Sequence, residues 1–153
     1  MRTILLLISF CVSIPVLASG EMEVHDPWIR EAPPTVKVLA GYFTLHNHSD
    51  KTHAIISVSS PKFESVEIHR TEIKNGMTRM HPVSKVMISS HGKVLFEPGG
   101  LHLMLINPKN KIKSGDKAQL TLHLADGSTF NFTVPVRKKE GMEDHSNHGT
   151  MHH

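Results

Sequence analysis

Cysteine is nearly absent from this 153-residue sequence, because its single cysteine, Cys11, lies inside an apolar run near the N-terminus. Residues 1–18 have the pattern of a signal peptide, in which a basic residue precedes an apolar run at 4–17 that ends in small residues. Cleavage is expected after Ala18, with Gly20 as the alternative. The mature chain then has no thiol, which excludes disulfides and thiolate metal ligands and predicts an exported, periplasmic protein.

Long apolar runs and basic clusters are also lacking. The run near the N-terminus falls short of the roughly 20 residues of a bilayer-spanning helix, so no membrane insertion is expected after signal cleavage. Lys and Arg total 17 against 14 Asp and Glu, and no basic block carries interleaved aromatic residues, which excludes nucleic acid as an expected partner. Nucleophile motifs, phosphate loops and carboxylate pairs near histidines are missing as well, so we expect no enzyme.

Helical periodicity is lacking in the mature sequence, and short segments with alternating apolar residues recur instead, bounded by Gly, Pro, Asn and Asp. The expected strands are 38–46, 54–59, 65–70, 78–83, 93–96, 101–106, 120–124 and 129–136. Asp126 and Gly127 between the last two strands predict a tight hairpin turn with positive φ. The pattern predicts one all-β domain over residues 19–137, a Greek-key barrel or sandwich.

Metal-binding side chains are abundant, with thirteen histidines and eight methionines. In the run LHLML at 101–105, the two-residue period of a strand places His102 and Met104 on one face and the leucines on the other. His69 and Met80, in two other expected strands, can supply a second imidazole and a second thioether. Two imidazoles with two soft thioethers favour Cu(I), whereas zinc would recruit thiolate or carboxylate. The alternative is that these residues are core filler and edge residues.

The spacing of the four donors is a pattern in itself. His69 is followed by ten residues and Met80, then by twenty-one residues and His102, then by one residue and Met104. This arrangement resembles the H-x10-M-x21-H-x-M signature of the periplasmic copper A chaperones, the PCuAC domain family, with every ligand position filled. The wider similarity covers residues 26–137 and includes three clear segments: DPWIR at 26–30, AGYFTL at 40–45 and PGGLHLML at 98–105.

The resemblance implies a cupredoxin-like β-barrel that binds Cu(I) at an exposed edge, and it carries all four donors over as ligands. It also implies delivery of copper, directly or through a Sco-type thiol protein, towards the binuclear copper centre in the copper subunit of cytochrome c oxidase. A sequestration or resistance protein without a delivery partner would use the same ligands, and the sequence leaves that alternative open. Met77 and His81 are possible substitutes, but the strand period places Met77 on the opposite face from Met80.

Residues 138–153 form a polar tail with little to bury, so we expect a flexible segment. The tail contains the candidate metal ligands His145, His148, Met151, His152 and His153. It is similar to the His/Met-rich ends of some family members, which implies a collector of Cu(II), and imidazoles at flexible spacing suit that tetragonal ion. A solvated tail without function, or a cloning remnant, is the alternative.

The remaining histidines are interpreted more simply. His46, His48 and His53 flank a turn and His91 adjoins another turn, so we expect solvated loop residues there. His25 lies near the mature N-terminus, where the α-amino group, backbone nitrogens and imidazole together can bind Cu(II) weakly.

Overall fold

The computed structural model describes residues 21–138, which form ten β-strands and no helix. The strands are β1 Met22–Arg30, β2 Val38–Asn47, β3 His53–Ser59, β4 Phe63–Lys74, β5 Met77–Pro82, β6 Val86–Ile88, β7 Lys93–Phe96, β8 Leu101–Pro108, β9 Lys117–Leu124 and β10 Thr129–Arg137. Within residues 21–138 no helix is long and apolar enough to cross a membrane. The expected signal peptide and the tail donors lie outside the described residues.

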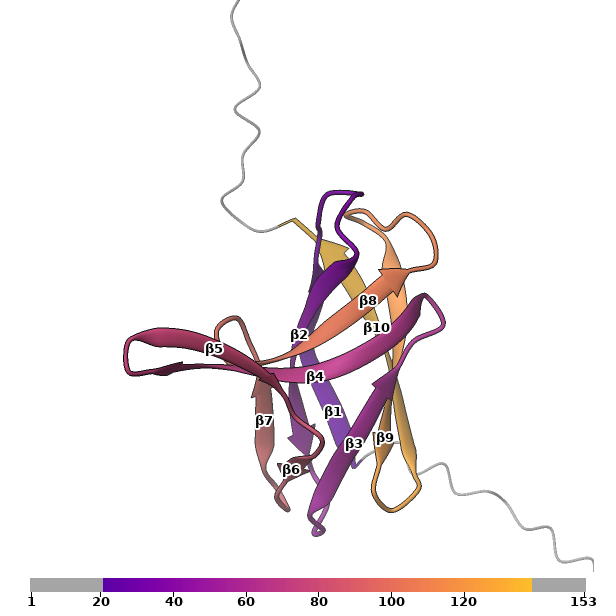
Figure 1. Ribbon diagram of the computed structural model, residues 1–153. Helices are drawn as coiled ribbons and strands as arrows, with labels where there is room; N and C mark the ends of the chain where they lie inside the picture. Colours follow the sequence, from indigo (N-terminus) through magenta and orange to yellow (C-terminus); the bar gives the residue numbers. More distant parts are fainter. Residues whose placement is uncertain (1–20, 139–153) are drawn as a thin grey trace, which may run out of the picture.

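Seven strands close into a barrel (Figure 1). They are hydrogen-bonded in the order β4-β8-β2-β1-β10-β9-β3, and a short β3–β4 pairing completes the ring. The β1–β10 pair is parallel and its two neighbouring pairs are antiparallel. Strands β5, β6 and β7 lie outside the ring and pair with β4, β3 and β2. The predicted cupredoxin-like Greek-key barrel is confirmed.

The leucines of β8 anchor the strand that carries two of the predicted donors. Leu101, Leu103 and Leu105 are buried in the core, so the two-residue period turns His102 and Met104 to the outer side of the barrel wall. Full burial of a leucine side chain contributes roughly 1.5–3 kcal/mol, which makes the opposite register of β8 costly. Core packing therefore decides which face of β8 presents the donors.

Close packing of β2 against β8 requires glycine at position 41. A Cβ added to Gly41 would lie 3.0 Å from Cδ1 of Leu105 and 3.5 Å from Cβ of Leu103. A larger residue would push β8 away from β2. The strand that carries the donors is therefore held at a fixed distance from its neighbour.

Strands β1 and β6 are not among the strands expected from the alternation of apolar residues, although residues 26–30 of β1 form one segment of the family resemblance. In β1 the alternation is interrupted where Asp26 has φ of 47° and the register with β2 shifts between His25 and Trp28, as in a β-bulge. Strand β6 has three residues, too few to show a period. The Asp-Gly hairpin between β9 and β10 is as predicted, with φ of 86° at Gly127.

The β4–β5 hairpin extends beyond the barrel, and Figure 1 shows it projecting from the closed wall. Its turn is formed by Asn75 and Gly76, whose φ values are 53° and 74°. Positive φ at both central residues is the signature of an Asn-Gly hairpin turn. This turn extends both strands past the predicted segments and exposes β5 as an edge strand.

Candidate metal site

Strand β4 runs between β5 and β8 and sets the geometry of the candidate metal site. In the antiparallel β4–β8 pair, His69 lies directly opposite His102, and Glu67 lies opposite Met104. Opposed residues, and residues two apart on one strand, share a face of the sheet. His69, His102 and Met104 are therefore on one face, and the two imidazole ring centroids are 6.2 Å apart. We call these three residues, together with Met80, the His/Met pocket.

Met80 joins this face from the edge strand. It lies opposite Thr71 in the β4–β5 pair, and Thr71 is two residues from His69, so Met80 is a diagonal neighbour of His69. Met104 occupies the other diagonal, on β8, and is partly buried. Met80 is 55% exposed on the projecting hairpin. The barrel wall thus holds three predicted donors, and the hairpin holds the fourth.

The two possible substitutes lie on the other side of the hairpin. Met77 is opposite Lys74 and His81 is opposite Arg70, both an odd number of residues from His69 along β4. The strand period places them on the face away from the pocket. Met77 is as exposed as Met80, 55% in each case. The two methionines therefore form a matched pair for mutagenesis.

His102 is held in one tautomer. Its side chain is 6% exposed, and Nδ1 lies 3.0 Å from the carbonyl oxygen of Gly100, which also accepts the backbone N–H of Thr71 at 3.0 Å. A carbonyl oxygen accepts hydrogen bonds and donates none, so Nδ1 carries the proton. The lone pair of Nε2 is left for a metal ion. A backbone partner on the second nitrogen is typical of metal-binding histidines.

His69 is oriented by the carboxylate of Glu67. Nε2 of His69 donates to Oε2 of Glu67 at 2.8 Å, which leaves the lone pair on Nδ1. Nδ1 is buried and has no hydrogen-bond partner within the described part of the chain. A buried polar atom without a partner costs about 1–3 kcal/mol. A cation bound at Nδ1 would remove that cost.

Sequence reasoning did not include Glu67 in the site, although a signal for it was present. Glu67 precedes His69 by two residues in one predicted strand, and the two-residue period places both on one face. A carboxylate beside a candidate histidine ligand is a common outer-shell arrangement. Glu67 is therefore the residue that the structure adds.

An aromatic group lies on the same outer face, next to the pocket. Ala40 is opposite Met104, and Tyr42 follows two residues later on β2. The Tyr42 ring lies 4.7 Å from that of Trp28, and the Arg30 guanidinium lies 5.4 Å from Tyr42 and 5.7 Å from Trp28. Burial raises the pKa of Tyr42, and the Arg30 charge opposes that shift. On this flank the Arg30 guanidinium therefore lies over a pair of aromatic rings, of which Tyr42 is buried.

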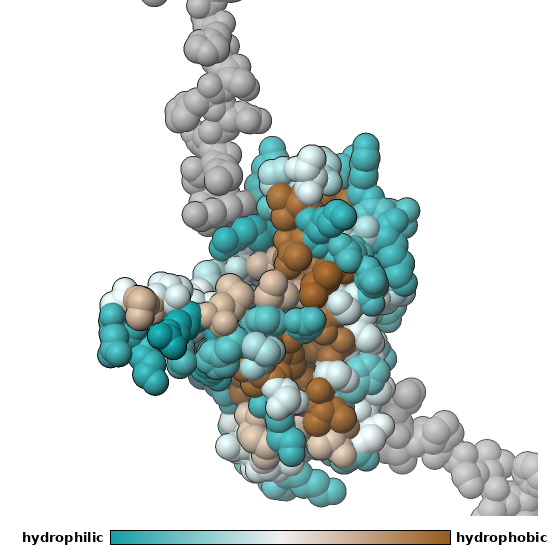
Figure 2. Space-filling model, in the orientation of Figure 1, coloured by the Kyte–Doolittle hydropathy of each residue, from teal (hydrophilic) through white to brown (hydrophobic). Residues whose placement is uncertain are grey.

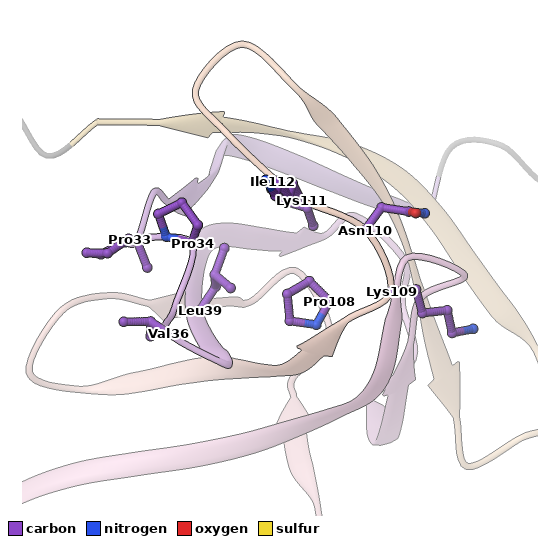
Figure 3. Close-up of a pocket in the computed structure, with 10 residues that line it drawn as sticks. Pro33, Pro34, Val36, Leu39, Pro108, Lys109, Asn110, Lys111 and Ile112 are labelled. Carbon is purple, nitrogen blue, oxygen red and sulfur yellow. The ribbon is translucent and has the colours of Figure 1, made fainter.

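The cavities of the barrel lie elsewhere. One cavity, of about 210 Å³, lies between the segment after β1 and the segment after β8. Figure 3 shows Pro33, Leu39 and Pro108 in its wall. None of the predicted donors lines it. A second groove, of about 300 Å³, follows the β3–β4 seam beside Glu67, and Figure 2 shows apolar surface along this side of the barrel. Of the four predicted donors, Met80 is the exposed one.

Within residues 21–138 no three His, Cys, Asp or Glu side chains are arranged as a ready-made metal site. The His/Met pocket contains two histidines, and the thioethers of Met80 and Met104 are its other predicted donors. The donors predicted in the tail lie outside the described residues. Their role stays a prediction.

The expectation of solvated loop histidines is wrong for His46 and His53. His46 lies within β2 and is partly buried, and His53 begins β3 with 8% of its surface exposed. His53 Nε2 is 3.1 Å from Oγ of Ser49, and its Nδ1 is 3.4 Å from the Asp126 carboxylate. The buried Asn47 amide fixes the turn between the two strands, because it donates to the carbonyl of Lys51 in the turn at 2.7 Å and to that of Ser89, just after β6, at 2.9 Å.

Comparison with known proteins gives a family and a fold. The family model described as putative lipoprotein LpqE-like matches residues 22–136. Uncharacterized protein RP573 of Rickettsia prowazekii (strain Madrid E) is 36% identical over 129 residues, covering 78% of this chain and 70% of that protein. Putative lipoprotein Lxx21020 of Leifsonia xyli subsp. xyli is 28% identical over 124 residues, covering 80% and 74%.

Solved structures with the same barrel are PCuAC domains and a copper protein. The apo PCuAC domain from PmoF1 has a TM-score of 0.65 at 22% identity, covering 78% of this chain and 96% of that one. The copper-bound PCuAC domain from PmoF2 has a TM-score of 0.64 at 21% identity, covering 78% and 95%. The Cu(I) form of DR1885 from Deinococcus radiodurans has a TM-score of 0.60 at 27% identity, covering 85% and 83%.

Proposed function

The chain belongs to the LpqE-like family and shares the barrel of the PCuAC domains, and from this we propose that it binds Cu(I) in the His/Met pocket and delivers it to another protein. The proposed recipient is the binuclear copper centre of cytochrome c oxidase, reached directly or through a Sco-type thiol protein. Relatives described as putative lipoproteins support an exported location, which we place in the periplasm. No step of this proposal needs a catalytic residue.

The observation that carries the proposal is the buried, unpartnered Nδ1 of His69. His69 and His102 lie opposite each other on one face of the β4–β8 pair, and one nitrogen of each ring is engaged by Glu67 or Gly100. Both ring tautomers are thus arranged before a metal ion arrives. Preorganised neutral imidazoles reduce the reorganisation that binding requires.

The donor set favours Cu(I) over divalent ions. Two imidazoles and two thioethers are neutral, and thioether sulfur is a soft donor that suits a monovalent d¹⁰ ion. Zn(II) prefers sites with thiolate or carboxylate ligands, and Glu67 is already engaged by His69. The similarity to a protein solved with Cu(I), DR1885, supports the same assignment.

The exposure of Met80 supports release by ligand exchange. Met80 is 55% exposed on an edge strand, whereas His102 is 6% exposed in the barrel wall. A partner thiolate can therefore approach the copper ion from the hairpin side and replace the thioether of Met80 first. Copper stays Cu(I) throughout, and the remaining ligands are exchanged in turn. Thiolate is the stronger donor, so transfer proceeds towards the partner.

The tail is proposed to collect Cu(II) before it reaches the pocket. Imidazoles of residues 138–153 would hold Cu(II), and a small one-electron reductant would convert it to Cu(I), which prefers the thioethers. A chain truncated after Arg137 should keep its Cu(I) affinity and lose Cu(II) stoichiometry. Unchanged Cu(II) stoichiometry would show that the tail is not the collector.

The binding proposal is tested by Cu(I) competition with a chromophoric chelator. Met80→Ala should weaken Cu(I) binding, while Met77→Ala should not, because the two residues are equally exposed on opposite faces of one hairpin. Met104→Ala should weaken binding as well. If Met80→Ala and Met104→Ala both bind Cu(I) as tightly as the unmodified chain, the pocket is not the site.

Delivery is tested separately from binding. The Cu(I)-loaded chain is mixed with a reduced Sco-type protein and with the soluble copper domain of the oxidase, and copper is measured in each protein after separation. Transfer to either acceptor supports delivery. Tight Cu(I) binding without transfer to either acceptor would favour sequestration instead.

A further inference from the structure

A second group of metal-binding side chains lies on the outer face of β1 and β2, away from the His/Met pocket. It consists of Glu23, His25, His46 and His48, which we call the Glu23 cluster. Oε2 of Glu23 lies 2.9 Å from Nε2 of His48 and 3.3 Å from Nε2 of His25. The His46 ring centroid is 4.6 Å from that of His25 and 6.0 Å from that of His48. Two imidazoles therefore contact one carboxylate, and the third, that of His46, lies beside both of their rings.

The backbone holds these four residues together. Glu23 is the register partner of His46, and His25 is the partner of Thr44, in the antiparallel β1–β2 pair. The backbone N–H of His48 donates to the carbonyl of Glu21 at 2.7 Å, which continues the pairing beyond the end of β2. All four side chains therefore lie on one face of the β1–β2 pair.

We propose that the Glu23 cluster is a binding site for Cu(II), distinct from the Cu(I) pocket. Three imidazoles and one carboxylate are borderline and hard donors, a set that suits divalent copper and lacks the sulfur that Cu(I) prefers. Among divalent first-row ions Cu(II) binds such sites most tightly. The proposal stands on these contacts and does not depend on the function of the pocket.

As the side chains now lie, no three of the described His, Cys, Asp or Glu residues form a metal site, so binding requires the side chains of the cluster to rotate. Glu23, His25 and His48 are 55%, 44% and 51% exposed, so their torsions are unhindered by the core. Metal–nitrogen bonds are about 2 Å long, so Cu(II) would replace the present hydrogen bonds to Glu23. Each Nε2 proton moves to Nδ1 or to solvent when the metal ion binds.

The two sites are well separated along β2. Ala40 is the partner of Met104, and His46 is six residues further along the strand, which corresponds to about 20 Å at roughly 3.3 Å per residue. Tyr42 and the Trp28 ring lie between these positions on the same face. The Glu23 cluster therefore cannot share a single copper ion with the His/Met pocket.

The test is Cu(II) binding to the mature chain, cleaved after Ala18, in which the four tail histidines are replaced by glutamine. In that background, the double variant His46→Gln and His48→Gln should bind Cu(II) at least about tenfold more weakly than its parent, and nitrogen couplings in the electron paramagnetic resonance spectrum should decrease. His91→Gln is the matched control, because His91 is also exposed and lies 2.8 Å from a carboxylate, that of Asp50. It should not change Cu(II) binding.

Three results would overturn the proposal: no Cu(II) binding by the parent, equal affinity in the double variant and its parent, or an equal loss in the His91→Gln control. An effect of His25→Gln without an effect of the double variant would also overturn it, because that pattern indicates binding at the N-terminal amine. Cu(I) affinity is measured in the same proteins with a chromophoric chelator. It should be the same in the double variant and its parent, so failure of this site is distinguishable from failure of the pocket.

Discussion

The His/Met pocket and the Glu23 cluster bring histidines together on one outer face of the barrel in two different ways. In the pocket, His102 is 6% exposed and His69 Nδ1 is buried, and each ring has one nitrogen committed to Glu67 or Gly100. In the cluster, His25 and His48 are about half exposed and share a carboxylate. Buried rings with fixed tautomers suit selective binding of one ion, whereas exposed rings suit capture of an ion from solution.

The donors differ as well as the burial. The pocket adds thioethers to imidazole, and the cluster adds a carboxylate, so the pocket favours Cu(I) and the cluster favours Cu(II). In the two proposed sites, imidazole is combined with different neighbouring donors and with different exposure. This difference is the basis for assigning Cu(I) to one and Cu(II) to the other.

The largest expected effect is a loss of stability when a core side chain beneath the pocket is removed. Leu103 is fully buried directly between His102 and Met104, so Leu103→Ala should lower the free energy of unfolding by about 2–5 kcal/mol through cavity formation. Leu95→Ala, on the exposed side of β7 opposite Thr44, should cost much less because Leu95 is 42% exposed. Urea denaturation measures both. Equal losses would show that β8 is not the rigid support of the pocket.

The next largest effect is expected on Cu(I) affinity when one imidazole of the pocket is removed. His102→Ala should lower Cu(I) affinity by about a hundredfold or more, because loss of an outer-shell partner alone costs about 10- to 100-fold. Cu(II) binding at the Glu23 cluster should be unaffected. Competition titrations in each oxidation state test both statements, and circular dichroism checks that the variant is folded. Parallel losses of Cu(I) and Cu(II) affinity would contradict the separation of the two sites.

Glu67 is expected to act through His69. Glu67→Ala should lower Cu(I) affinity by about 10- to 100-fold, and Glu67→Gln should restore part of it, because the amide oxygen can still accept from Nε2. Nitrogen-15 chemical shifts of His69 should show loss of the fixed tautomer in the alanine variant. Glu72→Ala, an odd number of residues from His69 and so on the other face of β4, is the control. An unchanged tautomer in Glu67→Ala would exclude this positioning role.

The smallest effect concerns acid titration of the Glu23 cluster. His48 and His25 lower the pKa of Glu23, so this interaction stabilises the fold above the unfolded-state pKa and is lost as the pH falls through the folded-state pKa. In His48→Gln the pKa of Glu23 should rise towards its ordinary value. Carboxyl carbon shifts in a nuclear magnetic resonance titration measure this change. His91→Gln should leave the titration of Glu23 as it is, and an equal rise there would contradict the assignment.

The sequence was sufficient wherever the pattern is local. Alternation in 101–105 predicted that His102 and Met104 share a face, and the Asp-Gly pair at 126–127 predicted the β9–β10 hairpin. The same period separated Met77 from Met80. A strand repeats every two residues whatever surrounds it, so such statements need no knowledge of its partners.

The tertiary structure decided which distant strands meet and in which register. His69 and His102 become opposed because β4 pairs with β8, and that pairing is set by barrel closure and by burial of the leucines of β8. The bulge at Asp26 and the β1–β2 pairing likewise bring His25 beside His46. The sequence by itself determined the donor types and the face of each strand. Their convergence required the packed core, because register between distant strands depends on the whole barrel.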